Sequence, residues 1–104
     1  MIDVTDNNFK EEVIGSSVPV LVDLWAPWCG PCRVNSIVIN EVSQGYNGNF
    51  KFCRLNVDTN PKTTEKYRVM AIPSMMLFKD GMVWDNIIGN VSSQDLKEKI
   101  ERLI

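Results

Sequence analysis

Histidine is absent from the 104 residues of this sequence. Its absence excludes catalytic pairs of cysteine with histidine and metal sites that contain histidine, so any proton transfer falls to other side chains. Cysteine is scarce, with three residues, and an odd number does not suit a small secreted protein held together by disulfides. Two of the three, Cys29 and Cys32, stand three positions apart, and Cys53 stands alone.

Long runs of apolar residues and of basic residues are missing as well. The longest apolar candidate, residues 18–25, is interrupted by Pro19 and Asp23 and is far shorter than the ~20 residues that span a bilayer. Lysine and arginine are scattered, and the net charge is −2. Residues 1–6 lack the basic and apolar regions of a secretory signal. We therefore expect no membrane segment and no nucleic-acid partner, whereas a targeting peptide that has been removed would leave no trace in this sequence.

The length and the composition predict one domain that covers residues 1–104. Hydrophobic residues make up 44% of the chain and charged residues 23%, as in ordinary globular proteins. Two apolar runs, 18–26 and 50–57, predict strands that are buried on both faces, in the middle of a partly parallel sheet. An Asp-Gly pair between the apolar runs 74–78 and 82–88 predicts a hairpin.

Caps and apolar spacing predict helices between and after these strands. Thr5 and Asp6 are expected to supply the cap of the first helix. The helices are expected between Asp6 and Gly15, from residues 29–32 to residues 47–48, from Asn60 to about Tyr67, and from Ser92 to Leu103. The resulting order, βαβαβαββα, predicts an α/β fold in which helices flank a central mixed sheet on both faces.

The run Trp28-Cys29-Gly30-Pro31-Cys32 carries the strongest chemical signal. If a helix begins here, the two cysteines lie one turn apart and can close a small disulfide ring. Cys29 would sit at the helix N-terminus, where backbone N–H groups favour a thiolate, and Cys32 would be the more buried, resolving thiol. Pro31 would stiffen the ring, and Gly30 would leave access to it open.

Two other interpretations of this cysteine pair remain. The pair is half of the ligand set of many structural zinc sites, but zinc needs four ligands, and the chain offers one further cysteine and no histidine. The cysteines are alternatively two unreactive buried side chains on a helix, although the flanking tryptophan, glycine and proline are unusual for a plain helix start. The sequence favours redox chemistry.

Asp23 is the second informative residue, because it interrupts an apolar strand six positions before Cys29. Burial raises the pKa of a carboxyl group, and a carboxyl that titrates nearer neutrality can accept the proton of Cys32. Arg54, in the adjacent predicted strand, would lower the pKa of Asp23 again and favour its ionised form. The alternative is an aspartate at the edge of the sheet, in contact with water.

With these residues in view, the sequence resembles the thioredoxin family over essentially its whole length. The resemblance is strongest over residues 20–32, and it is supported by residues 54–58, 71–74, 77–81 and 88–89. It implies a thioredoxin fold and a general protein disulfide reductase that works by dithiol–disulfide exchange. It also implies that the activity needs no metal and no organic cofactor, because the Cys29–Cys32 pair is itself the redox group.

The resemblance implies a role for each site residue. Cys29 matches the nucleophile, Cys32 the resolving cysteine and Asp23 the buried proton acceptor, whereas Trp25 and Arg54 match positions that tune the site. Residues implied in substrate binding are Trp28, Gly30, Pro31, Ile72, Pro73, Gly89 and Val91. Pro73 matches a proline that follows a cis peptide bond and exposes the backbone of the residue before it. A trans turn proline and, for Trp28, a simple packing role are the alternatives.

The sequence departs from the family pattern at several positions near the site. Ile37 stands where a proline that kinks the helix is common, so a straighter helix is expected. Asn35 and Ser36 replace apolar and small residues just beyond the dithiol, and Met70 replaces an arginine that is common near the groove. Further departures are Arg54 in place of lysine and Asn90 in place of alanine. For Cys53, a small buried hydrophobic residue is favoured over a regulatory thiol.

The expected partners are disulfide-containing target proteins and a thioredoxin reductase that depends on either NADPH or ferredoxin. We expect a monomer that acts in the cytoplasm, with the plastid stroma, after removal of a transit peptide, as the alternative. Competing functions are a binding module in which the dithiol is incidental and an oxidase or isomerase of an oxidising compartment. A dimer bridged by a metal ion through two such cysteine pairs is a more distant candidate.

Overall fold

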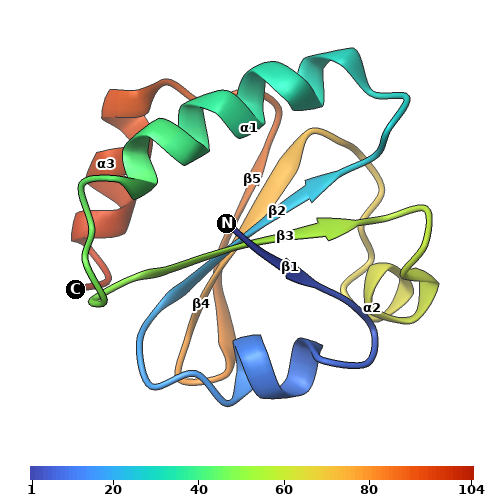
Figure 1. Cartoon of the computed structure of the whole chain (residues 1–104), viewed down its shortest axis with the longest axis horizontal. Helices are drawn as coiled ribbons and strands as arrows, with labels where there is room; N and C mark the ends of the chain where they lie inside the picture. Colours follow the sequence, from blue (N-terminus) through green and yellow to red (C-terminus); the bar gives the residue numbers. More distant parts are fainter.

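A five-stranded mixed sheet forms the middle of the molecule, with strand order β1-β3-β2-β4-β5 (Figure 1). The computed structural model describes residues 1–104. The strands are β1 (Ile2–Val4), β2 (Val20–Trp25), β3 (Lys51–Asn56), β4 (Ser74–Lys79) and β5 (Met82–Ile88). β1, β3 and β2 run parallel, whereas β4 is antiparallel to both β2 and β5. The predicted mixed sheet is confirmed.

Helical segments cover both faces of this sheet, as the sequence predicts. The long helix α1 (Gly30–Ser43) and α3 (Ser93–Glu101) lie together on one face, and η1 (Lys10–Ile14) and α2 (Pro61–Lys66) lie on the other side (Figure 1). Each face has its own apolar cluster, one around Phe52 and Leu96 and the other around Phe9 and Leu55. The chain order βαβαβαββα is therefore observed, although no residue range is predicted from the sequence for its first strand, β1.

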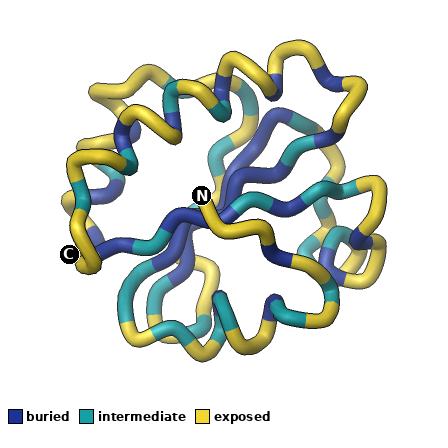
Figure 2. Tube along the Cα trace, viewed as in Figure 1, coloured by how far each residue is buried: buried dark blue, intermediate teal, exposed yellow.

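The central strands are buried, and this explains their nearly continuous apolar sequences. Figure 2 shows the buried residues gathered along the middle of the sheet and on the inner sides of the helices. In β2 and β4, the first five residues are all buried. Because neighbouring strands cover both edges of β2, the single carboxylate in it, Asp23, has no exposed edge to occupy.

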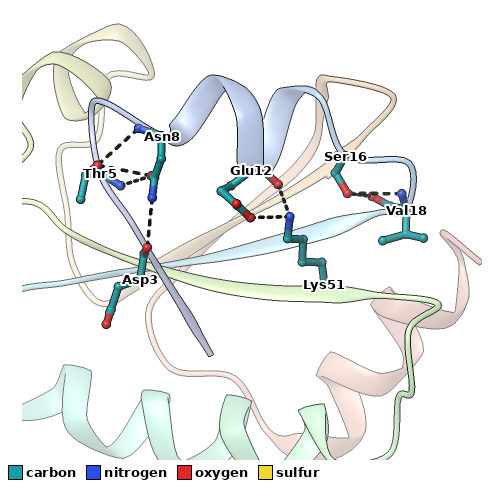
Figure 3. A network of polar contacts seen from close by, with 7 residues as sticks. All are labelled: Asp3, Thr5, Asn8, Glu12, Ser16, Val18 and Lys51. Atoms are coloured by element: carbon teal, nitrogen blue, oxygen red, sulfur yellow. Dashed lines mark hydrogen bonds and ion pairs between the residues drawn. The ribbon is translucent and has the colours of Figure 1, made fainter.

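The first helical segment differs from its prediction in type and in its cap. It is a short π-helix whose N-cap residue, Phe9, supplies no side-chain cap, and Thr5 and Asn8 form reciprocal hydrogen bonds in the turn before it (Figure 3). The Thr5 amide donates to Asn8 Oδ1 at 2.6 Å, and the Asn8 amide donates to Thr5 Oγ1 at 3.3 Å. The prediction that Thr5 and Asp6 cap this helix is therefore wrong, and the Asp6 carboxylate instead accepts hydrogen bonds from the backbone amides of Lys62 and Thr63 at the start of α2.

The π-helix is connected to the sheet by one lysine. The Lys51 ammonium group forms an ion pair with Glu12 Oε2 at 2.7 Å and donates to the Glu12 carbonyl at 2.8 Å (Figure 3).

The other helix boundaries differ from the predicted ones by a few residues. Helix α1, for example, ends at Ser43 rather than at residues 47–48. Helix ends fray, and the turn residues 44–48 extend the connection to β3.

Candidate active site

The two cysteines of the Cys-Gly-Pro-Cys run lie at the start of α1, directly after a short turn that follows β2. Cys29 is the N-cap residue, and its Sγ accepts a hydrogen bond from the backbone amide of Cys32 at 3.3 Å. The two residues form a disulfide, with their Cα atoms 5.3 Å apart. Pro31 falls in the first turn, where its missing N–H removes no helical hydrogen bond. Gly30 and Pro31 are exposed, whereas both cysteines are buried.

Asp23 lies in the middle of the sheet and has no exposed surface. The Ser36 hydroxyl, on α1, donates to Asp23 Oδ2 at 2.6 Å, and Asp23 Oδ1 has no hydrogen-bond partner. Burial raises the pKa of Asp23 from 3.8 to about 6, against the opposing effects of the Ser36 hydrogen bond and the charge of Arg54. The alternative of an aspartate at a hydrated sheet edge is thereby excluded.

Arg54 and Trp25 lie together in the lining of a pocket that also includes Cys32. The guanidinium carbon of Arg54 lies 4.1 Å from the centroid of the Trp25 ring, a cation–π arrangement. The pocket measures about 440 Å³, and its lining includes Trp25, Arg54, Cys32 and Ser36. The resemblance implies that Trp25 and Arg54 tune the site. The two side chains lie together, in the pocket that Cys32 also lines.

A second groove, of about 400 Å³, runs along the other side of the dithiol. Trp28, Met70 and Ile72 line it, and Ile72 also packs against the cluster that contains both cysteines. The Trp28 side chain is 70% exposed, and its indole N–H donates to Asp58 Oδ2 at 2.9 Å. The groove is apolar and open, and Ile72 connects it to the cluster that contains the dithiol, although neither cysteine lines it.

Pro73 follows a cis peptide bond after Ile72, as the resemblance implies, and the trans alternative is wrong. Pro73 is itself buried, and its carbonyl accepts a hydrogen bond from the Gly89 amide at 2.8 Å. Gly89 has a φ of +89°, a conformation that side-chain-bearing residues rarely adopt. The hydrogen bond places Gly89 beside Pro73, so these two residues, which the resemblance implies in substrate binding, are neighbours.

Three polar contacts at the site join partners that the sequence does not indicate. Asn35 is completely buried, and its Oδ1 accepts a hydrogen bond from the Val91 amide at 3.2 Å. Ser36 and Asp58 contact Asp23 and Trp28, respectively. Asn35 and Ser36 stand out in the sequence as departures from the family pattern, but that pattern does not say what they touch. For Asp58 no spacing rule applies.

Helix α1 continues without interruption through Ile37, whose side chain is 59% exposed. Cys53, in contrast, is completely buried in β3, and burial raises the pKa of its thiol to about 11. No group of three or more histidine, cysteine, aspartate or glutamate side chains is arranged to hold a metal ion. No helix of the chain is long and apolar enough to cross a bilayer.

Comparisons with known proteins agree with this geometry. A family model described as Thioredoxin matches residues 1–102. The chain is similar to Thioredoxin 1 of Nostoc sp., with 46% identity over 99 residues that cover 95% of this chain and 92% of that protein. It is also similar to the M-type chloroplastic thioredoxin of Pisum sativum, with 46% identity over 97% of this chain and 59% of that protein. Thioredoxin of Pseudomonas aeruginosa is 46% identical over 92% of this chain and 89% of its own length.

Proposed function

The chain belongs to the thioredoxin family, and we propose which of its residues carry out the reduction of disulfides in other proteins. It is a protein disulfide oxidoreductase, and Cys29–Cys32 is its redox-active disulfide. Its family implies disulfide-containing proteins as targets and a reductase as the source of electrons. Residues 1–104 are proposed to act as a single domain that needs no metal or organic cofactor.

Cys29 is proposed as the nucleophile. In the reduced protein its sulfur lies at the N-terminus of α1, where free backbone N–H groups and the helix dipole stabilise a thiolate. The hydrogen bond from the Cys32 amide to Cys29 Sγ supports this assignment. The thiolate attacks one sulfur of the target disulfide, forms a mixed disulfide, and displaces the other target sulfur as a thiolate.

Cys32 and Asp23 are proposed to complete the reaction. Asp23 accepts the proton of the Cys32 thiol, and the Cys32 sulfur attacks Cys29 Sγ, so that the second target sulfur leaves and the Cys29–Cys32 disulfide forms. The burial of Asp23 and its pKa of about 6 support the role, because the group is mostly ionised at neutral pH and still binds a proton readily. The target departs with two thiols.

The groove beside the dithiol is proposed to bind the target chain. The Ile72 amide and carbonyl take part in no hydrogen bond within the protein, so both are available to an extended segment. Trp28 supplies exposed apolar surface and Ile72 supplies half-buried apolar surface, and the exposed Gly30 and Pro31 leave room above the disulfide. Pro73, Gly89 and Val91 are proposed to shape the opposite wall.

The electron donor and the compartment are further proposals. Relatives from bacteria and one described as chloroplastic support a cytoplasmic protein, with the plastid stroma as the alternative. The reductase is correspondingly an NADPH-dependent flavoenzyme or a ferredoxin-dependent enzyme, and assays coupled to each would separate the two. We propose a monomer, which light scattering of the reduced and oxidised protein would test.

The disulfide at the N-terminus of α1 beside Ile72 and Pro73 is the observation on which this function rests. Its test is the reduction of insulin, driven by dithiothreitol, by the wild type and by the Cys29→Ser variant. The wild type is expected to accelerate precipitation of the insulin chains, and the variant is expected to be inactive. A Cys32→Ser variant should instead trap the target as a mixed disulfide. A folded but inactive wild type would favour a module that only binds.

A further inference from the structure

One hydroxyl group, that of Ser36, is hydrogen-bonded to the buried carboxyl group of Asp23. Ser36 follows Cys32 by four positions on α1, so the two side chains share a face of the helix. Its Oγ is 2.6 Å from Asp23 Oδ2 and is the sole hydrogen-bond donor to that carboxyl. Ser36 is half-buried and lines the pocket that also contains Cys32.

We propose that Ser36 is a positioning residue of the resolving step, in which its hydroxyl holds the Asp23 carboxylate in place and connects it to the pocket that Cys32 lines. The inference rests on the proposed role of Asp23 as the proton acceptor. A hydroxyl donates and accepts hydrogen bonds, so Ser36 bonds both the carboxylate and the carboxylic acid that forms when the proton arrives. Oδ2 is then occupied by Ser36, and Oδ1 stays free for the proton of the thiol.

The resolving step moves one proton and exchanges one disulfide bond for another. The Cys32 S–H bond breaks and its proton goes to Asp23, while the electron pair left on sulfur forms the bond to Cys29 Sγ. The bond between Cys29 and the target breaks, and its electron pair leaves on the target sulfur, which takes a proton from water. Asp23 must afterwards return its proton to solvent, and Ser36 lies between the buried carboxyl group and the pocket.

Other groups around Asp23 also influence its titration, and their effects must be distinguished from that of Ser36. Arg54 occupies the paired position on β3, and its charge also favours the carboxylate. From α1, Cys32 titrates in the reduced protein, and Arg33 lines the same pocket. On β4 the paired residue is Met75, which does not titrate. Replacing Ser36 leaves all of these groups in place.

The first measurement is the titration of the Asp23 carboxyl carbon by NMR in the reduced protein, without any target. Ser36→Ala should move the midpoint upward by about one pH unit, because a hydrogen bond to the carboxylate is lost. Ser36→Thr keeps the hydroxyl and should restore the wild-type midpoint. Ser43→Ala is the matched control, since the Ser43 hydroxyl bonds the Asn40 carbonyl at the far end of the same helix.

The second measurement is the rate at which a preformed mixed disulfide on Cys29 releases its target. Ser36→Ala should slow release about threefold at pH 6.5 and have no effect at pH 8.5, where the carboxyl is ionised in both proteins. In an Asp23→Asn background the same substitution should change nothing. An unmoved midpoint in Ser36→Ala would overturn the role of Ser36, whereas a moved midpoint with an unchanged release rate would overturn the role of Asp23.

Discussion

Arg54 and Asp23 occupy paired positions on the parallel strands β3 and β2, yet they form no ion pair. The Arg54 guanidinium lies over the Trp25 ring, and its Nε is 3.5 Å from Asp3 Oδ1 at the outer edge of the sheet. Its charge nevertheless lowers the pKa of Asp23 against the larger effect of burial. Arg54 thus acts on the carboxyl group through space, from a position that Trp25 holds.

Replacing Arg54 with methionine should raise the pKa of Asp23 above its value of about 6. The substitution removes the positive charge and keeps an unbranched side chain against Trp25. We expect an upward movement of about half a pH unit, because the Arg54 side chain is 32% exposed and its field is screened by water. Arg54→Lys keeps the charge and should move the midpoint less. Equal midpoints in the wild type and Arg54→Met, measured by carbon NMR, would contradict this account.

The buried carboxyl group of Asp23 should also make the free energy of unfolding depend on pH. Because the pKa of Asp23 is raised from 3.8 to about 6 on folding, the folded state binds its proton more tightly than the unfolded state does. The free energy of unfolding therefore falls as the pH rises through the window from about 4 to about 6. At about 1.4 kcal/mol per pH unit, the loss amounts to roughly 3 kcal/mol above this window.

An Asp23→Asn variant should escape this loss, since the amide stays neutral and still accepts the Ser36 hydrogen bond. The free energy of unfolding of the variant, measured in urea, should exceed that of the wild type by an amount that grows from pH 4 to pH 6 and then stays constant. Asp80→Asn, in the exposed turn before Gly81, is the matched control and should show no such growth. A difference between Asp23→Asn and wild type that is independent of pH would argue against a raised pKa.

The elements whose causes are local were predictable from the sequence. The hairpin follows from Asp80 and Gly81, both of which have positive φ angles as the tight turn requires. The strand that contains Asp23 follows from its apolar run, and the start of α1 follows from the cysteine and proline at its first turn. The cis bond before Pro73 was expected only from the family resemblance.

Contacts between distant parts of the chain were not predictable. Asp6 caps α2, which begins at Pro61, because β1 and β3 are neighbours in the sheet and bring the two loops together. Asn35 bonds a backbone amide 56 positions away, and Trp28 bonds a carboxylate 30 positions away. Such partners are set by tertiary packing, about which local propensity and spacing carry no information.

Cys53 should behave as a packing residue and not as a reactive thiol. It has no exposed surface, and burial raises the pKa of its thiol to about 11, so almost no thiolate exists at neutral pH. The oxidised native protein should therefore release no thiol to a chromogenic disulfide reagent within minutes, and one thiol per chain in denaturant. Rapid labelling of the native oxidised protein would revive the regulatory alternative, and a Cys53→Ala variant would identify the site.

Asn35 should contribute to stability through a backbone contact. Its side chain is fully buried and supplies the acceptor for the Val91 amide. Asn35→Ala removes that acceptor and leaves space in the core, so it should lower the free energy of unfolding by about 1–3 kcal/mol. Asn40→Ala, at an exposed position on the same helix, should change it by less than about 0.5 kcal/mol. Equal effects of the two substitutions in urea unfolding would show that the buried contact contributes nothing.

Met70 should influence which proteins are reduced without affecting the exchange chemistry. Its side chain is 93% exposed and lines the groove that also contains Trp28 and Ile72. Met70→Asp places a charge where an apolar target side chain would dock, and we expect the KM for insulin to rise about five- to tenfold, since losing about 1 kcal/mol or more of apolar contact has this effect. The rate with a small chromogenic disulfide, which does not reach the groove, should stay near that of the wild type.

Met82→Asp is the matched control for the Met70→Asp substitution. Met82 is 73% exposed and starts β5 at the edge of the sheet, but it lines neither the groove nor the pocket beside Cys32. The two substitutions change the net charge equally, so a general electrostatic effect on insulin would appear in both. A rise in KM for Met70→Asp alone therefore assigns target docking to the groove. Equal changes in the two variants would instead mean that the protein's overall charge, and not this apolar surface, controls the encounter with insulin.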